Sequence, residues 1–217
     1  TFEGGKEVQL SNMFDYMPRL IKHFFGEGVV ESHYNVDSTI SPSIVETAHS
    51  NRHDMGSTIL SSKVEEEKIT KWLTSAGKTS RPKLLYRASR DGWGASDFHR
   101  MCDGKGATVT VVKSSGGYIF GGYTNVAWGQ SIVYKSSTES FLFSLKDHAG
   151  IGPLKMPIKS AATDRAVWHG SLYGPTFGGS YDLCVGSNAN SNTESSSNVG
   201  NTYQLPSNTY FPRFLTG

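Results

Sequence analysis

The chain has 217 residues, enough for one sizeable hydrophobic core with an extension but short for two full domains. Its 21 basic and 19 acidic residues give a net charge of +2 without long runs of one sign, which excludes the strongly basic surface typical of proteins that bind nucleic acid. No apolar stretch approaches the roughly 20 residues that cross a bilayer, so we expect no membrane insertion.

The N-terminal part predicts an amphipathic helix followed by an irregular segment. Ser11 can cap a helix over residues 12–25, whose apolar side chains share one face and which Pro18 bends or delays. We expect this helix to pack on the domain or on a partner subunit. Contact with a membrane surface is the alternative, disfavoured because Arg19 and Lys22 are its only basic residues. Residues 27–55 show no sustained periodicity and predict a wrapping segment or a linker.

Neither a metal nor a cofactor is expected. His33, His49 and His53 lie in the irregular segment, but only the last two approach the spacing of paired zinc ligands, and no third ligand has an equal claim. Residues 77–79 (GKT) lack the first glycine of a phosphate-binding loop. Residues 104–106 (GKG) lack the third glycine of a dinucleotide-binding motif and precede a strand rather than a helix.

A second helix is predicted over residues 63–75. Its apolar face consists of Val64, Ile69, Trp72 and Leu73. Three glutamates occupy the first turn, where the helix dipole favours negative charge, and Gly77 follows the last turn as a stop. These start and stop signals agree with the apolar pattern, so both ends of the helix are predicted.

Downstream of this helix the pattern changes to short strands separated by glycine-rich turns. Strands are expected at 83–88, 107–113, 118–123, 140–145, 181–185 and 209–214, and one short helix at 96–101. Residues 116–117 (GG) predict a hairpin and 91–92 (DG) a turn between strands. The polar composition of 186–202 predicts an exposed loop. Together these elements predict an α+β fold, mainly β: a two-layer antiparallel β-sandwich with a few flanking helices.

Five motifs within this region occur in a fixed order. They are residues 86–93 (YRASRDGW), 102–113 (CDGKGATVTVVK), 120–123 (FGGY) followed by Trp128, 140–145 (SFLFSL) and 173–183 (YGPTFGGSYDL). In this order and spacing the set resembles the TLDc domain family, the module of oxidation resistance proteins and of several TBC-domain and BTB-domain proteins. The resemblance predicts a TLDc-like domain over residues 57–217 and leaves residues 1–56 as an N-terminal extension.

The resemblance also predicts a final strand at the C-terminal end of the domain. Family members normally finish with one more strand, beyond the position of residues 214–217, and this strand is absent from the sequence. Two interpretations stay open. Either the chain is cut short, or another segment, such as part of residues 1–55, fills a sheet edge that would otherwise invite aggregation.

The resemblance implies a non-enzymatic interaction domain linked to protection against oxidative damage and, as for several family members, to binding of the V-type ATPase. Its signature positions are candidates for contact with a protein partner: Arg90, Asp91, Gly92, Gly121, Glu139, Gly178, Gly179 and Asp182. For the glycines, close packing is the favoured alternative, because glycine beside aromatic residues in strands usually marks close backbone approach. For Glu139 and Asp182, hydrogen bonding to turn amides or exposure to solvent is favoured over acid and base catalysis.

An enzyme is the second hypothesis. No nucleophile-elbow or zinc-protease motif is present, so no catalytic residue is assigned. Cys102 or Cys184 could in principle pair with His99, His148 or His169 for thiol-based redox or hydrolytic chemistry. The family resemblance, however, implies that Cys102 is packed in a short helix before a strand. Whether the two cysteines form a disulfide is open.

The compartment and the oligomeric state are less constrained by the sequence. Few cysteines and no Asn-x-Ser/Thr sequon favour the cytoplasm. A secreted or matrix-associated binding protein is the alternative, in which Thr1 would be a processed N-terminus. The oligomeric state stays open.

Overall fold

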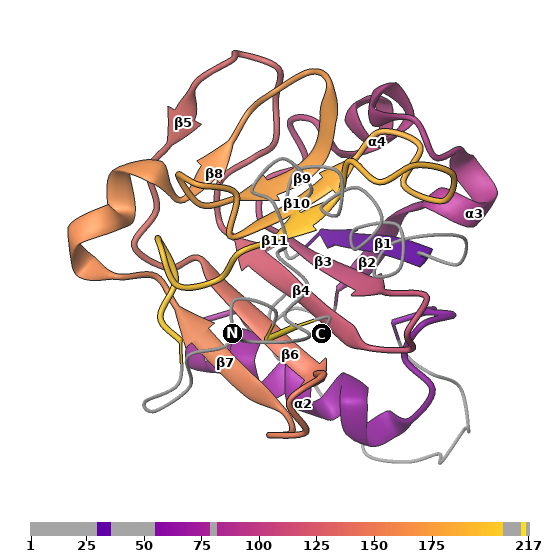
Figure 1. Cartoon of the computed structure of the whole chain (residues 1–217), viewed down its shortest axis with the longest axis vertical. Coiled ribbons are helices and arrows are strands. Elements are labelled where there is room, and N and C mark those ends of the chain that lie inside the picture. Colours follow the sequence, from indigo (N-terminus) through magenta and orange to yellow (C-terminus); the bar gives the residue numbers. More distant parts are fainter. Residues whose placement is uncertain (1–29, 36–54, 79–81, 206–213, 216–217) are drawn as a thin grey trace, which may run out of the picture.

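Two antiparallel sheets pack face to face in the computed structural model, which describes residues 30–35 (backbone only), 55–78, 82–205 and 214–215 (Figure 1). The first sheet has the order β2 (Lys83–Arg87), β1 (Val30–Asn35), β3 (Thr108–Lys113), β4 (Ile119–Thr124), β6 (Phe141–Lys146) and β7 (Leu154–Pro157). The second has the order β11 (Ser196–Ser197), β10 (Leu183–Gly186), β9 (Tyr173–Phe177), β8 (Val167–Trp168) and β5 (Tyr134–Lys135). The predicted mainly-β sandwich is confirmed.

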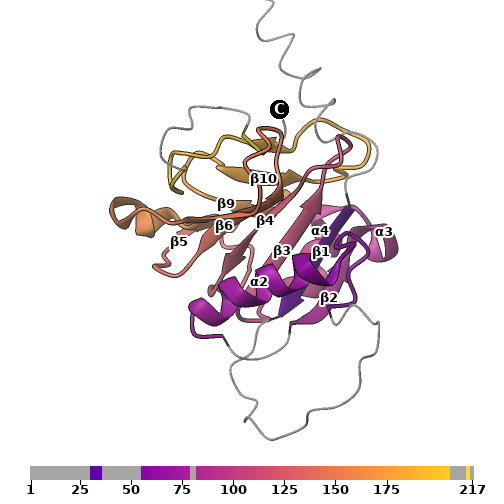
Figure 2. The same ribbon diagram turned by 90° about the horizontal axis from the view of Figure 1, so that it is seen from below.

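Helices lie around this sandwich. Among the described residues they are α2 (Lys63–Ser75), α3 (Ala88–Asp91), α4 (Ala95–Cys102) and the 3-10 helix η1 (Ser160–Arg165). Figure 2 shows α2 on one side of the six-stranded sheet and β9 and β10 on the other. The six-stranded sheet is therefore the middle layer of three.

The middle layer is buried on both faces because side chains alternate along each strand. On β4, Phe120 joins the cluster between the two sheets, where Phe177 and Leu183 come from the second sheet. Tyr123 points to the opposite face and joins a second cluster with Ile69 of α2. Every residue of β4 is consequently buried.

Helix α2 has the predicted bounds, and its start has a local cause. The Ser62 hydroxyl accepts a hydrogen bond from the Glu65 amide, and the Glu65 carboxylate accepts one from the Ser62 amide, which is a capping box. Ile69 and Leu73 are buried, as expected from the apolar face. Val64 was placed on the same face, but it is 69% exposed, because the spacing of 3.6 residues per turn puts it on the opposite side of the helix from Leu73.

Strand β1 comes from the N-terminal extension and lies between β2 and β3. It pairs with β3 over six residues, from Val30–Lys113 to Asn35–Thr108, and with β2 on its other side. A segment of residues 1–55 thus completes the sheet, but in its interior rather than at an edge. His33 belongs to this strand. The predicted helix at 12–25, His49 and His53 lie outside the described residues.

Several local predictions need correction. The glycine hairpin at 116–117 joins β3 to β4 as expected, and the short helix at 96–101 is confirmed as α4. The turn at 91–92 joins two helices, α3 and α4, because residues 88–91 form a single helical turn. Strands β5, β7, β8, β9 and β11 and helix η1 were missed, as was β1, which lies in the segment expected to be irregular. Most of the strand expected at 209–214 lies outside the described residues.

The segment 186–202 is only in part the exposed loop that its composition predicts, since exposed side chains such as Glu194 alternate with buried ones. Ala189 and Val199 are part of the core cluster between the sheets, and Ser195 is fully buried. Ser195 accepts a hydrogen bond from the Gly186 amide at 2.9 Å, which satisfies that amide inside the protein. A polar side chain such as Ser195 can be buried in this core because a backbone hydrogen bond replaces its contact with water.

Candidate functional site

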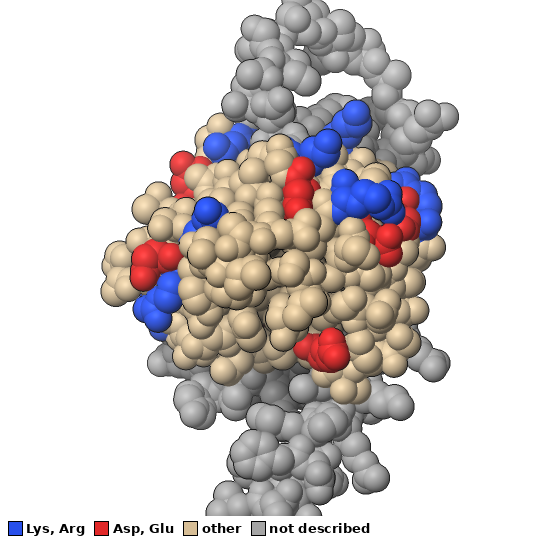
Figure 3. All heavy atoms as spheres, turned by 90° about the horizontal axis from the view of Figure 1, so that it is seen from above, with Lys and Arg blue, Asp and Glu red and all other residues tan. Residues whose placement is uncertain are grey.

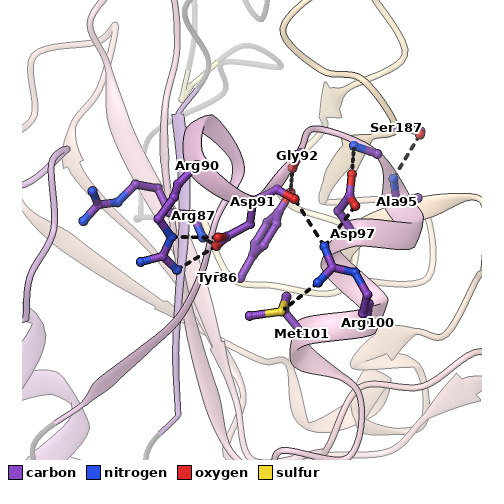
Figure 4. Close-up of polar contacts among 11 residues, drawn as sticks. Tyr86, Arg87, Arg90, Asp91, Gly92, Ala95, Asp97, Arg100, Met101 and Ser187 are labelled. Carbon is purple, nitrogen blue, oxygen red and sulfur yellow. Dashed lines mark hydrogen bonds and ion pairs between the residues drawn. The ribbon is translucent and has the colours of Figure 1, made fainter.

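The first signature motif folds into the compact turn of α3 and α4, shown in Figure 4. The Asp91 carboxylate accepts hydrogen bonds from the Arg87 amide at 2.8 Å and from the Arg90 guanidinium at 2.7 and 2.8 Å. The hydrogen bonds from this guanidinium and from the Arg87 amide, together with the charge of nearby Arg100, lower the pKa of Asp91 below its usual value. The motif acid therefore holds the start of α3.

Gly92 is required by the geometry of the same turn. Its φ is 111°, and a Cβ placed on it would lie 2.1 Å from Oδ2 of Asp97. Its carbonyl accepts the Tyr86 hydroxyl at 2.6 Å, and Asp97 in turn accepts the Gly94 amide and the Arg100 guanidinium at 3.2 Å each (Figure 4). Gly92 is thus a packing residue, while the Arg90 side chain is about half exposed.

The fifth signature motif, residues 173–183, forms a second structural turn around Asp182. The fully buried Asp182 carboxylate accepts hydrogen bonds from four successive backbone amides, those of residues 200–203, at 3.0 to 3.1 Å. Gly178 has a φ of 86°, and a Cβ there would lie 2.3 Å from this carboxylate. The Gly179 amide donates to the Thr202 hydroxyl at 2.8 Å. Asp182 therefore holds turn amides, as the favoured alternative expects.

Gly121 and Glu139 lie apart from these two turns. A Cβ on Gly121 would lie 1.9 Å from the Thr110 carbonyl oxygen, so only glycine fits where β4 passes β3. Glu139 is exposed and lies 3.5 Å from the Lys78 ammonium group. Most of the signature positions thus have a structural role, and of the eight only Arg90 and Glu139 are exposed.

A groove lies beside the first and the fifth motif, where the residues that follow or precede them come together. The Ala95 amide donates to the Ser187 hydroxyl at 3.0 Å, and the Asn188 amide donates to the Trp93 carbonyl at 2.7 Å. The groove beside these contacts has a volume of about 920 Å³. Its walls are the start of α4, the turn between β8 and β9, and the segment after β10, which Figure 1 shows close together at one end of the molecule.

His99 connects two of these walls. Its Nδ1 lies 2.8 Å from the Asp103 carboxylate, and its Nε2 lies 3.1 to 3.2 Å from the carbonyl oxygens of Gly170 and Tyr173. Asp103 also accepts the Gln130 side-chain amide at 2.9 Å. Helix α4 and the β8–β9 turn are therefore joined by a buried histidine. Sequence reasoning considered His99 only as a partner of a cysteine and missed this role.

The cysteines offer no accessible nucleophile. Cys102 is 0% and Cys184 1% exposed, and both are thiols rather than halves of a disulfide. The Thr176 hydroxyl donates to the Cys184 sulfur at 3.4 Å. Burial also lowers the pKa of the His169 imidazole, which disfavours its charged form. A thiol enzyme needs an exposed sulfur of low pKa, and this arrangement does not provide one.

Within the described part of the chain, no group of three or more His, Cys, Asp or Glu side chains is placed to hold a metal ion. No helix there is long and apolar enough to span a bilayer.

The TLDc domain model matches residues 55–214, which is well over half of the chain. The chain belongs to the TLDc domain family. A stretch of 73 residues of this TLDc protein is also 29% identical to the mTOR-associated protein MEAK7 of Danio rerio. The match covers 34% of this chain and 16% of the relative, so the chain spans only a small part of that protein's length. Strand β1 lies outside the matched TLDc region and still belongs to its sheet.

Proposed function

We propose that this TLDc protein is a non-enzymatic interaction domain that acts in the cytoplasm, binds subunits of the V-type ATPase, and through this binding contributes to protection against oxidative damage. The observation that carries the proposal is the family match over residues 55–214. The V-type ATPase is the partner that the family resemblance implies. The buried cysteines support an indirect role in oxidative protection, because no exposed thiol can react with an oxidant.

mTOR is a second candidate partner. The zebrafish relative is named for its association with mTOR, and the shared 73 residues favour testing the same association here. The match covers only 16% of that protein, which places mTOR second among the candidate partners. The V-type ATPase therefore remains the first partner to test.

A binding experiment with purified components tests the partner. The full chain is immobilised and exposed to the purified soluble sector of the V-type ATPase, with the soluble sector of an F-type ATPase as matched control. We expect saturable binding to the V-type sector and none to the F-type sector at the same concentration. Equal binding to both sectors, or no binding to either, would contradict the proposed partner.

A second experiment separates an interaction role from thiol chemistry. Cells depleted of this protein are supplied with the wild-type chain or with the Cys102→Ala/Cys184→Ala double variant, and survival under peroxide is measured. An interaction domain protects equally well in both forms once their amounts in the cell are matched. Protection by the wild type alone would support direct thiol chemistry instead.

A further inference from the structure

The groove beside α4 is lined mainly by hydroxyl and amide side chains and carries one charge. That charge is Glu194, which is exposed. Among the described residues, no lysine or arginine lines the groove and no cation forms an ion pair with Glu194. An unpaired carboxylate in a partly enclosed groove attracts a cationic group and repels phosphates and carboxylates.

Exposed apolar side chains lie on the groove wall and beside the strand β8 that leads into it. Five large apolar side chains are exposed in the described part of the chain, and three of them are Leu172 (75%), Ile132 (64%) and Val133 (43%). Leu172 lies on the groove wall, in the β8–β9 turn. The Ile132 amide donates to the His169 carbonyl at 2.8 Å, so residues 132–133 lie against the strand that leads into this turn. Grouped exposed apolar side chains of this kind mark contact surfaces.

This end of the molecule carries few charges. Figure 3 views it from above, and charged side chains lie mainly toward the margins of a broad uncharged area. Near α4, the charged groups Arg90 and Asp91 pair with each other, as do Arg100 and Asp97. Glu194 is therefore the charge on the groove that is available to a partner.

Unusual backbone conformations surround the same surface. In the described ranges, the non-glycine residues with left-handed φ are Ile132 (55°), Tyr181 (56°) and Asn188 (54°). Asn188 lines the groove, and the Tyr181 ring lies 6.0 Å from the ring of Tyr173 in its wall. A β-branched residue such as Ile132 rarely adopts this conformation, and such strain is retained mainly where it serves function.

The walls of the groove are fixed before any partner binds. Hydrogen bonds from Ala95 to Ser187 and from Asn188 to Trp93 join α4 to the segment after β10. His99 joins α4 to the β8–β9 turn. A preformed groove loses little conformational entropy on binding, which favours recognition of a short segment.

We infer that this groove, with Ile132, Val133 and Leu172 beside it, is the surface through which the domain holds its partner, and that its occupant is an extended protein segment in which a lysine or arginine is flanked by apolar side chains. The cation pairs with Glu194, and the flanking side chains pack on Leu172 and Ile132. A volume of about 920 Å³ is large enough for several side chains of such a segment. The inference rests on the proposed interaction function and specifies its contact surface.

The test uses two synthetic pentapeptides, Ser-Leu-Arg-Leu-Ser and Ser-Leu-Glu-Leu-Ser, both with blocked termini. Each is titrated into the ¹⁵N-labelled full chain, and amide chemical shifts are recorded by NMR. We expect saturable shifts centred on Ser96, Leu172 and Glu194 with the arginine peptide and at least tenfold weaker binding of the glutamate peptide. Equal binding of both peptides, no shifts, or shifts centred elsewhere would overturn the inference.

Matched variants separate the surface from general effects on folding. Glu194→Lys and Leu172→Asp should each weaken binding of the arginine peptide at least tenfold. Glu67→Lys and Val64→Asp make the same changes at exposed positions of α2, on the far side of the six-stranded sheet, and should leave binding unchanged. An equal loss in both pairs would contradict the assignment of the surface.

The outcome is independent of the identity of the partner. Peptide binding without binding to the V-type ATPase would retain the groove and reject the proposed partner. Binding to the V-type ATPase that survives Glu194→Lys and Leu172→Asp would reject the groove and retain the partner.

Discussion

Asp182 and Glu194 are two acids on either side of strand β10 with opposite environments. The Asp182 carboxylate is fully buried and accepts hydrogen bonds from four successive backbone amides. The Glu194 carboxylate is exposed on a groove and has no ion pair among the described residues. Asp182 belongs to the motif by which the family is recognised and Glu194 does not. The comparison teaches that the recognisable positions shape the fold, whereas the contact surface that we propose consists mostly of residues outside the motifs.

The largest expected effect comes from removing the buried Asp182 carboxylate. Asp182→Ala leaves four amides without their acceptor, and we expect a loss of about 3–5 kcal/mol of unfolding free energy in urea. Asp164→Ala is the control, because its side chain is 70% exposed, and it should change stability by less than about 0.5 kcal/mol. Similar losses in the two variants would show that the amide cluster contributes little.

The second test concerns Gly121, the glycine of β4 that lies closely against the backbone of β3. Gly121→Ala forces a Cβ against the Thr110 carbonyl, and we expect a loss of about 3 kcal/mol, near the upper end for overpacking. Gly104→Ala has open space around its Cβ and meets only the cost of a left-handed backbone, about 1 kcal/mol. Thermal unfolding of both variants measures the difference. A Gly121→Ala protein as stable as Gly104→Ala would contradict the packing role.

The third test sharpens the comparison at the groove itself. His99→Phe leaves the carbonyls of Gly170 and Tyr173 without their donor, and we expect a loss of about 1–3 kcal/mol. Amide hydrogen exchange is then followed by mass spectrometry in the variant and the wild type. The substitution should accelerate exchange in the β8–β9 turn more than in the rest of the second sheet. Unchanged protection of residues 169–174 would mean that His99 does not hold this wall.

The smallest expected effect is the pH dependence at Asp91. Its folded pKa is lowered from 3.8, chiefly by the hydrogen bond from Arg90, so the carboxylate contributes stability above its unfolded pKa and loses that contribution as pH falls through the folded value. The difference in unfolding free energy between wild type and Asp91→Asn should be constant above about pH 5 and shrink below about pH 4. Urea midpoints from pH 7 to 2.5 measure it. A difference that grows toward low pH would reverse the assigned sign.

Strong local signals made parts of the fold predictable. The glutamates after Ser62 and the stop at Gly77 gave α2 its bounds, and the glycine pair at 116–117 gave the hairpin. Helix α3 was missed because one helical turn has no periodicity to detect. The partial burial of residues 186–202 was missed because a polar composition does not reveal that several amides of this segment are satisfied internally by Asp182 and Ser195.

The site was less predictable than the fold. The motifs pointed to Arg90 through Asp182 as contact candidates, and the structure gives most of them a role in packing or hydrogen bonding. Ala95, Leu172 and Glu194 lie far apart in the sequence and meet only in the folded chain. None of them belongs to a motif, so only the placement of α4 against β9 and the segment after β10 brings them together.

The most direct measurement of the central claim is binding of the soluble sector of the V-type ATPase by three forms of the full chain. These are the wild type, the Leu172→Asp/Glu194→Lys variant of the groove, and the Val64→Asp/Glu67→Lys variant of α2. We predict binding by the wild type and by the α2 variant, and at least a hundredfold weaker binding by the groove variant. Loss of binding in the α2 variant with full binding by the groove variant would contradict the account.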